Sequence, residues 1–200
     1  MFNGQLVTVV VNHFSSKGGS APILGIEQPF EARQEDVTVN GSLDERQAQS
    51  VAVQAFFSDL LAADPAAKIV VLGDFNEFEF ISPLRSLEAA GLTNLTWRLD
   101  EHERYSFIFQ GNSQSLDHIL VSDSLRDMAH FDAVHLNVEF AETPARASDH
   151  DPLVVGLEIA LPTPSSKDDC KNGGWRELTR LDGTGFRNQG QCIRYFNTGR

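Results

Sequence analysis

The feature that most constrains the fold of this chain is a series of short apolar runs rich in β-branched residues. The runs occupy residues 6–11, 68–72, 116–121 and 152–157. Apolar runs of this length, bounded by Gly, Pro, Asn and Asp, are typical of strands rather than of helices. Helical patterns lie between them, so we expect a layered α/β (α+β) sandwich.

Two helices are expected between these strands. The first begins after Ser42, where Ser42 and Glu45 have the spacing of a capping box. A second, shorter helix opens at Ser82-Pro83, with Pro at its first position, and closes at Gly91. The first helix is expected to pack on the core through an apolar stripe. That stripe consists of Ala48, Val51, Ala52, Ala55, Phe56 and Leu60.

Further strands are expected late in the main part of the chain. Residues 105–109 and 116–121 have the pattern of paired strands separated by a turn at 111–113. Residues 134–140 alternate between apolar and polar side chains, which predicts a half-buried strand. The segment 15–41 is long for a loop, and loops of that length are usually functional.

A change of composition divides the chain. Residues 161–166 are rich in Pro and Ser, which is typical of a short, semi-rigid linker. We therefore predict a main domain over 1–160, a linker over 161–167 and a separate C-terminal segment over 168–200.

Charge follows the same division. The chain carries 16 Lys+Arg against 28 Asp+Glu, a net charge of −12, of which residues 1–160 contribute −15 and residues 161–200 contribute +3. An acidic main domain repels a polyanion unless divalent cations bridge the two. No apolar run approaches the roughly 20 residues that span a bilayer, which argues against a transmembrane helix.

The only two cysteines, Cys170 and Cys192, both follow the linker. They cannot form a structural zinc site by themselves, and their spacing is not C-x-x-C. They form either one disulfide or a pair of reduced thiols. Because so short a segment has little core of its own, we favour the disulfide and an oxidising compartment, which means a secreted or cell-surface protein. The N-terminus of this chain has no signal-peptide pattern.

Small polar clusters accompany the apolar runs. Each alone has an ordinary structural explanation, as a turn, a cap or a surface histidine. Together they are explained more simply by one shared site, because active sites gather where rigid strands meet loops. Carboxylate and amide oxygens suit Mg²⁺ or Ca²⁺, and imidazole transfers protons near neutral pH. The clusters are Asn12-His13, Gly73-Asp74-Phe75-Asn76, Leu116-Asp117-His118 and Ser148-Asp149-His150.

In order and spacing these motifs resemble the endonuclease/exonuclease/phosphatase superfamily, over about residues 5–158. The stretch at 105–109, Tyr-Ser-Phe-Ile-Phe, is most similar to the branch of bacterial extracellular nucleases. The resemblance implies part of a four-layer αββα sandwich of the deoxyribonuclease type. It also implies divalent-metal-dependent hydrolysis of phosphodiesters in nucleic acid, with DNA as the expected substrate.

The resemblance further implies catalytic roles for single residues. His150 would be the general base that activates water, oriented by Asp117. Asp74 and Asn76 would position the nucleophile and stabilise the transition state. His13 would donate a hydrogen bond or a proton to the phosphate or the leaving group.

Metal and phosphate contacts are implied in the same way. Asp149, together with Asp74, would hold Mg²⁺, with Ca²⁺ or Mn²⁺ as alternatives. Asn12, Lys17 and Arg46 are candidates for phosphate contacts, although a solvated helix-face Arg and a loop Lys are alternatives for the last two. His118 should point to the opposite face of its strand from Asp117 and is taken as structural.

One departure from the superfamily pattern is large. In that superfamily each half of the sandwich supplies one sheet, and an Asn and a metal-binding Glu lie upstream of the motif that contains His13. Only twelve residues precede His13 here. We therefore expect the N-terminal half of the domain to be missing from this chain, and the chain to have little activity alone. A phosphoesterase for lipid or inositol phosphates and a catalytically deficient surface or binding module are the alternatives.

Overall fold

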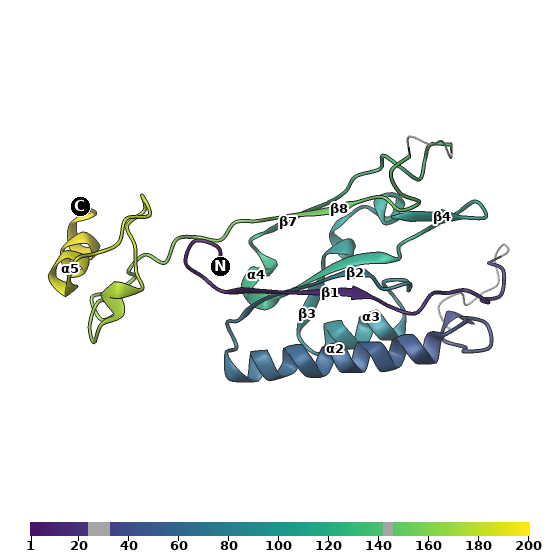
Figure 1. The fold of residues 1–200 in the computed structure, drawn as a ribbon, viewed down its shortest axis with the longest axis horizontal. Coiled ribbons are helices and arrows are strands. Elements are labelled where there is room, and N and C mark those ends of the chain that lie inside the picture. Colours follow the sequence, from purple (N-terminus) through teal and green to yellow (C-terminus); the bar gives the residue numbers. More distant parts are fainter. Residues whose placement is uncertain (24–32, 142–145) are drawn as a thin grey trace. The chain divides into compact units, whose positions relative to one another are not determined.

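The computed structural model describes residues 1–23, 33–141 and 146–200, so part of the predicted loop 15–41 lies outside the described residues. The chain divides into two compact units (Figure 1). The larger unit is Thr8–Leu157, and the smaller one combines Met1–Val7 with Glu158–Arg200.

The larger unit is built on a four-stranded sheet in the order β1-β2-β6-β3. These strands are β1 (Val7–His13), β2 (Lys68–Asp74), β6 (Asp117–Ser122) and β3 (Leu92–Asn94). Strands β2 and β6 are antiparallel, and their register places Asp74 opposite Asp117. Asp117 is the first residue of β6, so the two carboxylates lie at the same end of their paired strands.

Helices α2 (Leu43–Ala63) and α3 (Ser82–Ala89) cover one face of this sheet (Figure 1). The start of α3 has Pro in its first turn, as predicted. The core between helices and sheet is apolar, and this mixed helix and sheet architecture confirms the expected α/β class. Its buried residues are Phe14, Phe57, Ile69, Val71, Phe75, Leu84, Leu87, Leu92 and Leu120.

Helix α2 differs from its prediction in two respects. Ser42 has a positive φ of 56° and its side chain makes no capping hydrogen bond, so the predicted capping box is wrong. The predicted apolar stripe is also wrong, because Val51 and Phe56 are exposed. Arg46 and Ser50 lie on the buried face instead, since both find hydrogen-bond partners inside the protein. The buried side chains of α2 are Leu43, Arg46, Ser50 and Phe57.

Strand β1 is buried on one face only, although its nearly continuous run of apolar side chains has the composition of a strand buried on both faces. Val10 packs on the core, whereas Val9 and Val11 are exposed. Successive side chains of a strand point to opposite faces. In β1 only the face that carries Val10 packs on the core.

A tight hairpin replaces the strand pair predicted around residues 111–113. Gln110 and Gly111 both have positive φ, 50° and 81°, which is the backbone of a two-residue type I′ turn. The chain consequently folds back at once, and β4 (Phe107–Phe109) pairs with β5 (Asn112–Gln114). Strand β6 pairs with β2 and β3 instead.

The segment 134–140 is not the strand that its alternation predicts. Strands β7 (Ala129–Ala133) and β8 (Leu153–Leu157) pair with each other, and residues 134–140 form a loop after β7. The backbone amides of Leu136, Asn137 and Val138 donate to the Asp151 carboxylate at 3.1, 2.7 and 3.1 Å. The alternating segment therefore wraps a buried carboxylate instead of joining a sheet.

Short helical segments complete the larger unit: η1 (Leu95–Arg98), η2 (Glu101–Glu103) and α4 (Asp123–Arg126). Among the described residues, no helix combines the length and the apolar character needed to cross a bilayer.

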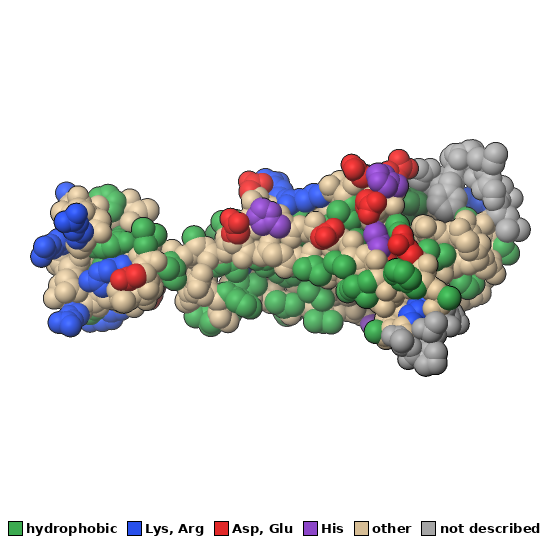
Figure 2. All heavy atoms as spheres, turned by 90° about the horizontal axis from the view of Figure 1, so that it is seen from above, with side chains coloured by type: hydrophobic (Ala, Val, Ile, Leu, Met, Phe, Trp, Pro, Cys, Tyr) green, Lys and Arg blue, Asp and Glu red, His purple; other side chains and the backbone are tan. Residues whose placement is uncertain are grey.

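The smaller unit contains η3 (Gly174–Arg176) and α5 (Gln189–Thr198). A disulfide joins Cys170 to Cys192, which confirms the predicted pairing. Both sulfurs are buried in a small cluster with Phe186. Figure 2 shows Lys and Arg side chains concentrated on this unit, and acidic and histidine side chains grouped on the larger one.

Candidate active site

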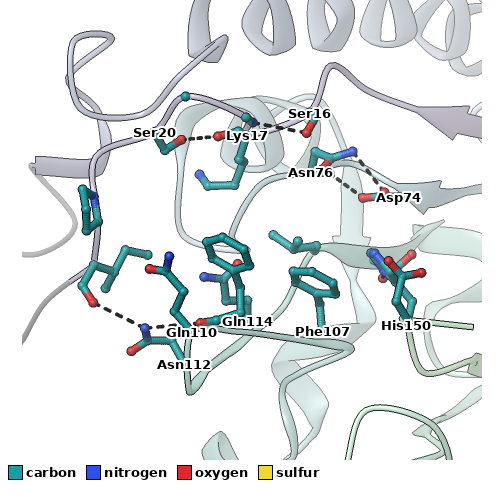
Figure 3. A pocket seen from close by; sticks show the side chains of 18 of the residues that line it. Ser16, Lys17, Ser20, Asp74, Asn76, Phe107, Gln110, Asn112, Gln114 and His150 are labelled. Carbon is teal, nitrogen blue, oxygen red and sulfur yellow. Dashed lines mark hydrogen bonds and ion pairs between the residues drawn. The ribbon is translucent and has the colours of Figure 1, made fainter. Parts of the chain in front are cut away.

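Three strand ends and one loop of the larger unit bring four predicted side chains to one place. His13 ends β1, Asp74 ends β2, and Asp117 begins the neighbouring β6. His150 comes from the loop before β8. All four, with Asn76, line one cavity of about 780 Å³. Figure 3 labels Asp74, Asn76 and His150 among the residues of its wall.

Asp117 and His150 form the shortest polar contact of this group. His150 Nδ1 lies 2.6 Å from Asp117 Oδ2, and Ser106 Oγ donates to the same oxygen at 2.6 Å. The hydrogen bond to Asp117 raises the pKa of His150, against the opposing effect of partial burial. A neutral His150 that donates from Nδ1 carries its free lone pair on Nε2, and that nitrogen can accept a proton.

Asp74 is held by Asn76. The Asn76 backbone amide donates to Asp74 Oδ1 at 2.8 Å, and its Nδ2 donates to Oδ2 at 3.0 Å. Asn76 has a φ of 49°, a left-handed conformation that Asn tolerates better than most residues. Burial raises the pKa of Asp74. His13 Nε2 lies 3.5 Å from Asp74 Oδ2, with its side chain 78% exposed.

The backbone of β2 near its end packs closely against the backbone of β1 near its end. Gly73 has a φ of +133°, and a Cβ there would lie 2.0 Å from the carbonyl oxygen of Asn12. Only glycine fits such a contact. The Asn12 side chain donates to the carbonyls of Val10 and Leu72 at 3.3 and 3.4 Å, and Asn12 is not among the residues that line the cavity.

The donor set of the cavity suits a hard divalent cation. Ligand atoms of Asp74, Asp117 and His150 lie within 4.8 Å of one another. Both carboxylates accept hydrogen bonds from the protein, but a carboxylate has about four acceptor positions, so capacity for a metal remains. Mg²⁺ is commonly held by one or two carboxylates and keeps several waters. Asp149 also lines the cavity, is exposed, and is not part of this three-residue group.

Arg46 and Lys17 belong to a buried ionic network around Glu77. Arg46 is fully buried, with its Nε and Nη2 at 3.1 and 3.0 Å from Glu77 Oε2 and its Nη1 donating to the Ser15 carbonyl at 3.0 Å. Lys17 Nζ lies 2.6 Å from both Glu77 Oε1 and Asn40 Oδ1. Arg46 is therefore neither a solvated helix-face residue nor a member of the cavity wall.

Lys17 differs from Arg46 because its side chain does line the cavity (Figure 3). Desolvation lowers its pKa to about 8, although Glu77 acts in the opposite direction. A lysine of this kind loses its proton more readily than a solvated one.

Sequence reasoning missed two residues that support the site, Ser106 and Asp151. Ser106 joins Asp117 through its hydroxyl, and its carbonyl accepts from the Asp151 amide at 2.7 Å. Burial opposes ionisation of Asp151, but hydrogen bonds from His135 and three backbone amides hold its pKa below the usual range. Asn137, in the loop that follows β7, donates its side-chain amide to the His150 carbonyl at 2.7 Å. Ser106 lies in the 105–109 stretch and Asp151 directly follows the Ser148-Asp149-His150 cluster, yet the partners of both residues are distant in sequence.

His118 is placed as the sequence predicts, away from the cavity. It is fully buried, and burial lowers its pKa. Its Nε2 contacts the Glu77 carbonyl at 2.8 Å and its Nδ1 contacts Thr96 Oγ1 at 3.1 Å.

Known proteins match the structure of this chain, but family models and curated proteins do not match its sequence. A crystal structure of TDP2 from C. elegans matches with a TM-score of 0.51 and 17% identity, over 76% of this chain and 42% of that one. The fold is therefore of the deoxyribonuclease-like type.

Two other structures are similar at lower scores. The 3′ phosphatase NExo from Neisseria has a TM-score of 0.47 and 18% identity, over 65% of this chain and 59% of that one. An endonuclease/exonuclease/phosphatase family protein from Bacteroides thetaiotaomicron has a TM-score of 0.40 and 20% identity, over 56% and 45%. The structural neighbours are thus proteins of the endonuclease/exonuclease/phosphatase type. The chain spans about half the length of the solved structures that it resembles.

Proposed function

We propose that the larger unit carries the hydrolytic site of a divalent-metal-dependent phosphodiesterase that acts on nucleic acid, with DNA as the expected substrate. The observation that carries the proposal is the Asp117–His150 contact at 2.6 Å, beside Asp74 in one cavity. A carboxylate on one imidazole nitrogen and an open second nitrogen are what a general base for water requires.

In the proposed reaction, His150 Nε2 takes a proton from the attacking water while the water oxygen bonds to phosphorus. Asp117 accepts the hydrogen bond from Nδ1 and stabilises the imidazolium that forms. Asp74, fixed by Asn76, orients the water. The bond from phosphorus to the leaving oxygen breaks, and His13 or solvent supplies the proton to that oxygen.

Mg²⁺ is the proposed cation, with Ca²⁺ or Mn²⁺ as alternatives. Asp74 and Asp149 are proposed to hold it, with Asp117 nearby. When bound, such an ion neutralises phosphate charge and lowers the pKa of bound water. The acidity of the larger unit supports this assignment, because a polyanionic substrate is otherwise repelled.

Phosphate contacts are proposed within the same cavity. Lys17 lines it and is the proposed direct contact. Arg46 and Asn12 hydrogen-bond to backbone carbonyls of β1 or of the segment that follows it, so they are proposed to act by positioning that backbone.

The proposed setting is outside the cytosol, as for a secreted bacterial nuclease. The Cys170–Cys192 disulfide supports this part of the proposal, because such bonds persist mainly in oxidising compartments.

The test combines metal binding with hydrolysis. Mn²⁺ titrated into the ¹⁵N-labelled chain should first broaden the NMR signals around Asp74, Asp117 and His150. Mg²⁺-dependent cleavage of a DNA oligonucleotide, slow as it is expected to be, should disappear in His150→Ala. It should persist in His102→Ala, which changes an exposed histidine that is not among the cavity residues.

Other outcomes would redirect the assignment. Cleavage of phosphatidylinositol or an inositol phosphate, but not of the oligonucleotide, would favour a lipid or inositol phosphoesterase. Broadening confined to other parts of the chain, with no hydrolysis of either substrate, would favour a binding module and refute the proposal.

A further inference from the structure

We propose that the part of the cavity beside the β4–β5 hairpin is a subsite for a nucleobase next to the scissile phosphodiester. This inference rests on the proposed function and narrows it, because it assigns the ring system that accompanies the phosphate. The observation that carries it is a row of aromatic rings that begins at the catalytic histidine.

The row consists of His150, Phe107 and Phe109. The Phe107 ring centroid lies 4.7 Å from that of His150, at an interplanar angle of 31°. Phe107 and Phe109 stand two residues apart on one face of β4, with centroids 6.3 Å apart and an interplanar angle of 13°. All three residues line the cavity, and Figure 3 draws Phe107 between His150 and the hairpin amides.

The outer ring of the row is open to a ligand. Phe109 is 52% exposed at the end of the hairpin, so a planar group that stacks on it removes apolar surface from water. Stacking of a base on an aromatic side chain tolerates every base, because each has a π-face. The exposed Phe109 ring is therefore available to a ligand and is not part of the core.

Amide side chains surround the same rings. Gln110, Asn112 and Gln114 all line the cavity (Figure 3). Each amide offers both a donor and an acceptor, which suits the polar edge of a base without selecting one. Asn112 Nδ2 also donates to the carbonyl of Ile23, another lining residue, at 3.3 Å, so the hairpin is joined to a second segment of the cavity wall.

The distribution of charged side chains along the cavity predicts the orientation of the ligand. The carboxylates Asp74, Asp117 and Asp149 stand with the histidines, where a cation and the phosphate are proposed to bind. The hairpin side has aromatic rings and neutral amides. A volume of about 780 Å³ is ordinary for a small-ligand site and accommodates a phosphate together with one base.

The experiment uses two probes that differ by one base. The dinucleotide TpT and its analogue with one thymine replaced by hydrogen are titrated into the ¹⁵N-labelled chain in Mg²⁺, with binding followed by NMR. Stacking of one base on an aromatic side chain typically strengthens binding about 5- to 150-fold, so TpT should bind more tightly by a factor in that range.

Variants assign the difference to the hairpin. Phe109→Ala should bind both probes equally weakly, and Phe109→Tyr, which keeps a ring, should retain the preference for TpT. Phe56→Ala is the matched control, because Phe56 on α2 is 51% exposed and is not among the cavity residues; it should behave like the parent chain.

The two proposals fail in different ways. Equal binding of both probes, unchanged in Phe109→Ala, would overturn the base subsite and leave phosphodiester recognition intact. No binding of either probe would overturn the subsite and the proposed function together.

Discussion

Replacing Arg46 by Ala is expected to destabilise the larger unit strongly, although Arg46 lies outside the cavity wall. Its guanidinium and the Glu77 carboxylate are both fully buried and lie 3.0 Å apart. Arg46 also donates to Asn40 Oδ1 at 2.7 Å and to the Ser15 carbonyl. The substitution therefore leaves a buried carboxylate with Lys17 as its remaining cationic partner.

The magnitude follows from the cost of an uncompensated buried charge. Removing one partner of a buried ion pair typically costs about 3–5 kcal/mol. In a chain of this length each kcal/mol lowers the Tm by roughly 2–4 °C, so the Tm should fall by about 6–20 °C. Lys17 moderates the loss because it stays hydrogen-bonded to Glu77, which favours the lower half of that range.

Urea and thermal unfolding followed by circular dichroism provide the assay. Arg85→Ala is the control, because the Arg85 side chain is 61% exposed and its ion pair with Glu88 is long, at 3.9 Å. Such surface changes usually alter stability by less than about 0.5 kcal/mol. Equal midpoints for Arg46→Ala and Arg85→Ala would show that the Arg46–Glu77 pair does not stabilise the larger unit.

Three further changes test other parts of the structure. Asp117→Asn should lower the pKa of His150, measured by NMR titration of the ring, because the hydrogen bond to Asp117 raises it; an unchanged pKa would contradict the pairing. In the parent chain this pair stabilises the fold below about pH 6.5, and the contribution disappears as the pH rises through the raised pKa. Gly73→Ala should cost about 4 kcal/mol or more, because the new Cβ would lie 2.0 Å from a carbonyl oxygen of β1; a parental Tm would exclude that clash. Reduction of Cys170–Cys192, 22 residues apart, should cost the smaller unit about 3 kcal/mol, seen as faster proteolysis there; no change in either mass or proteolysis would argue against the bond.

Local sequence determined much of this protein's secondary structure. Short β-branched runs predicted β1, β2, β6 and β8, because strand formation here follows from neighbouring residues and their burial. The Ser82-Pro83 sequence predicted the start of α3 for the same reason, since Pro suits the first turn of a helix. The two cysteines determined which residues a disulfide joins, because the described chain offers no other thiol partner.

The candidate site was predictable as a set of residue types at strand ends, and its geometry was not. The sequence named Asp74 and Asp117, but the antiparallel register that places them opposite each other depends on residues more than forty positions apart. The contact of His150 with Asp117 depends likewise on a loop held by Asp151, whose amide donors belong to a segment with the alternation of a strand.

Only the tertiary structure decided which polar residues are buried. Arg46 and Ser50 take the inner face of α2 and Phe56 the outer face, against the periodicity of the helix. A hydrophobic pattern records the average cost of removing each residue type from water. It does not record whether a distant partner such as Glu77 offsets that cost, and such partners become adjacent only when the chain has folded.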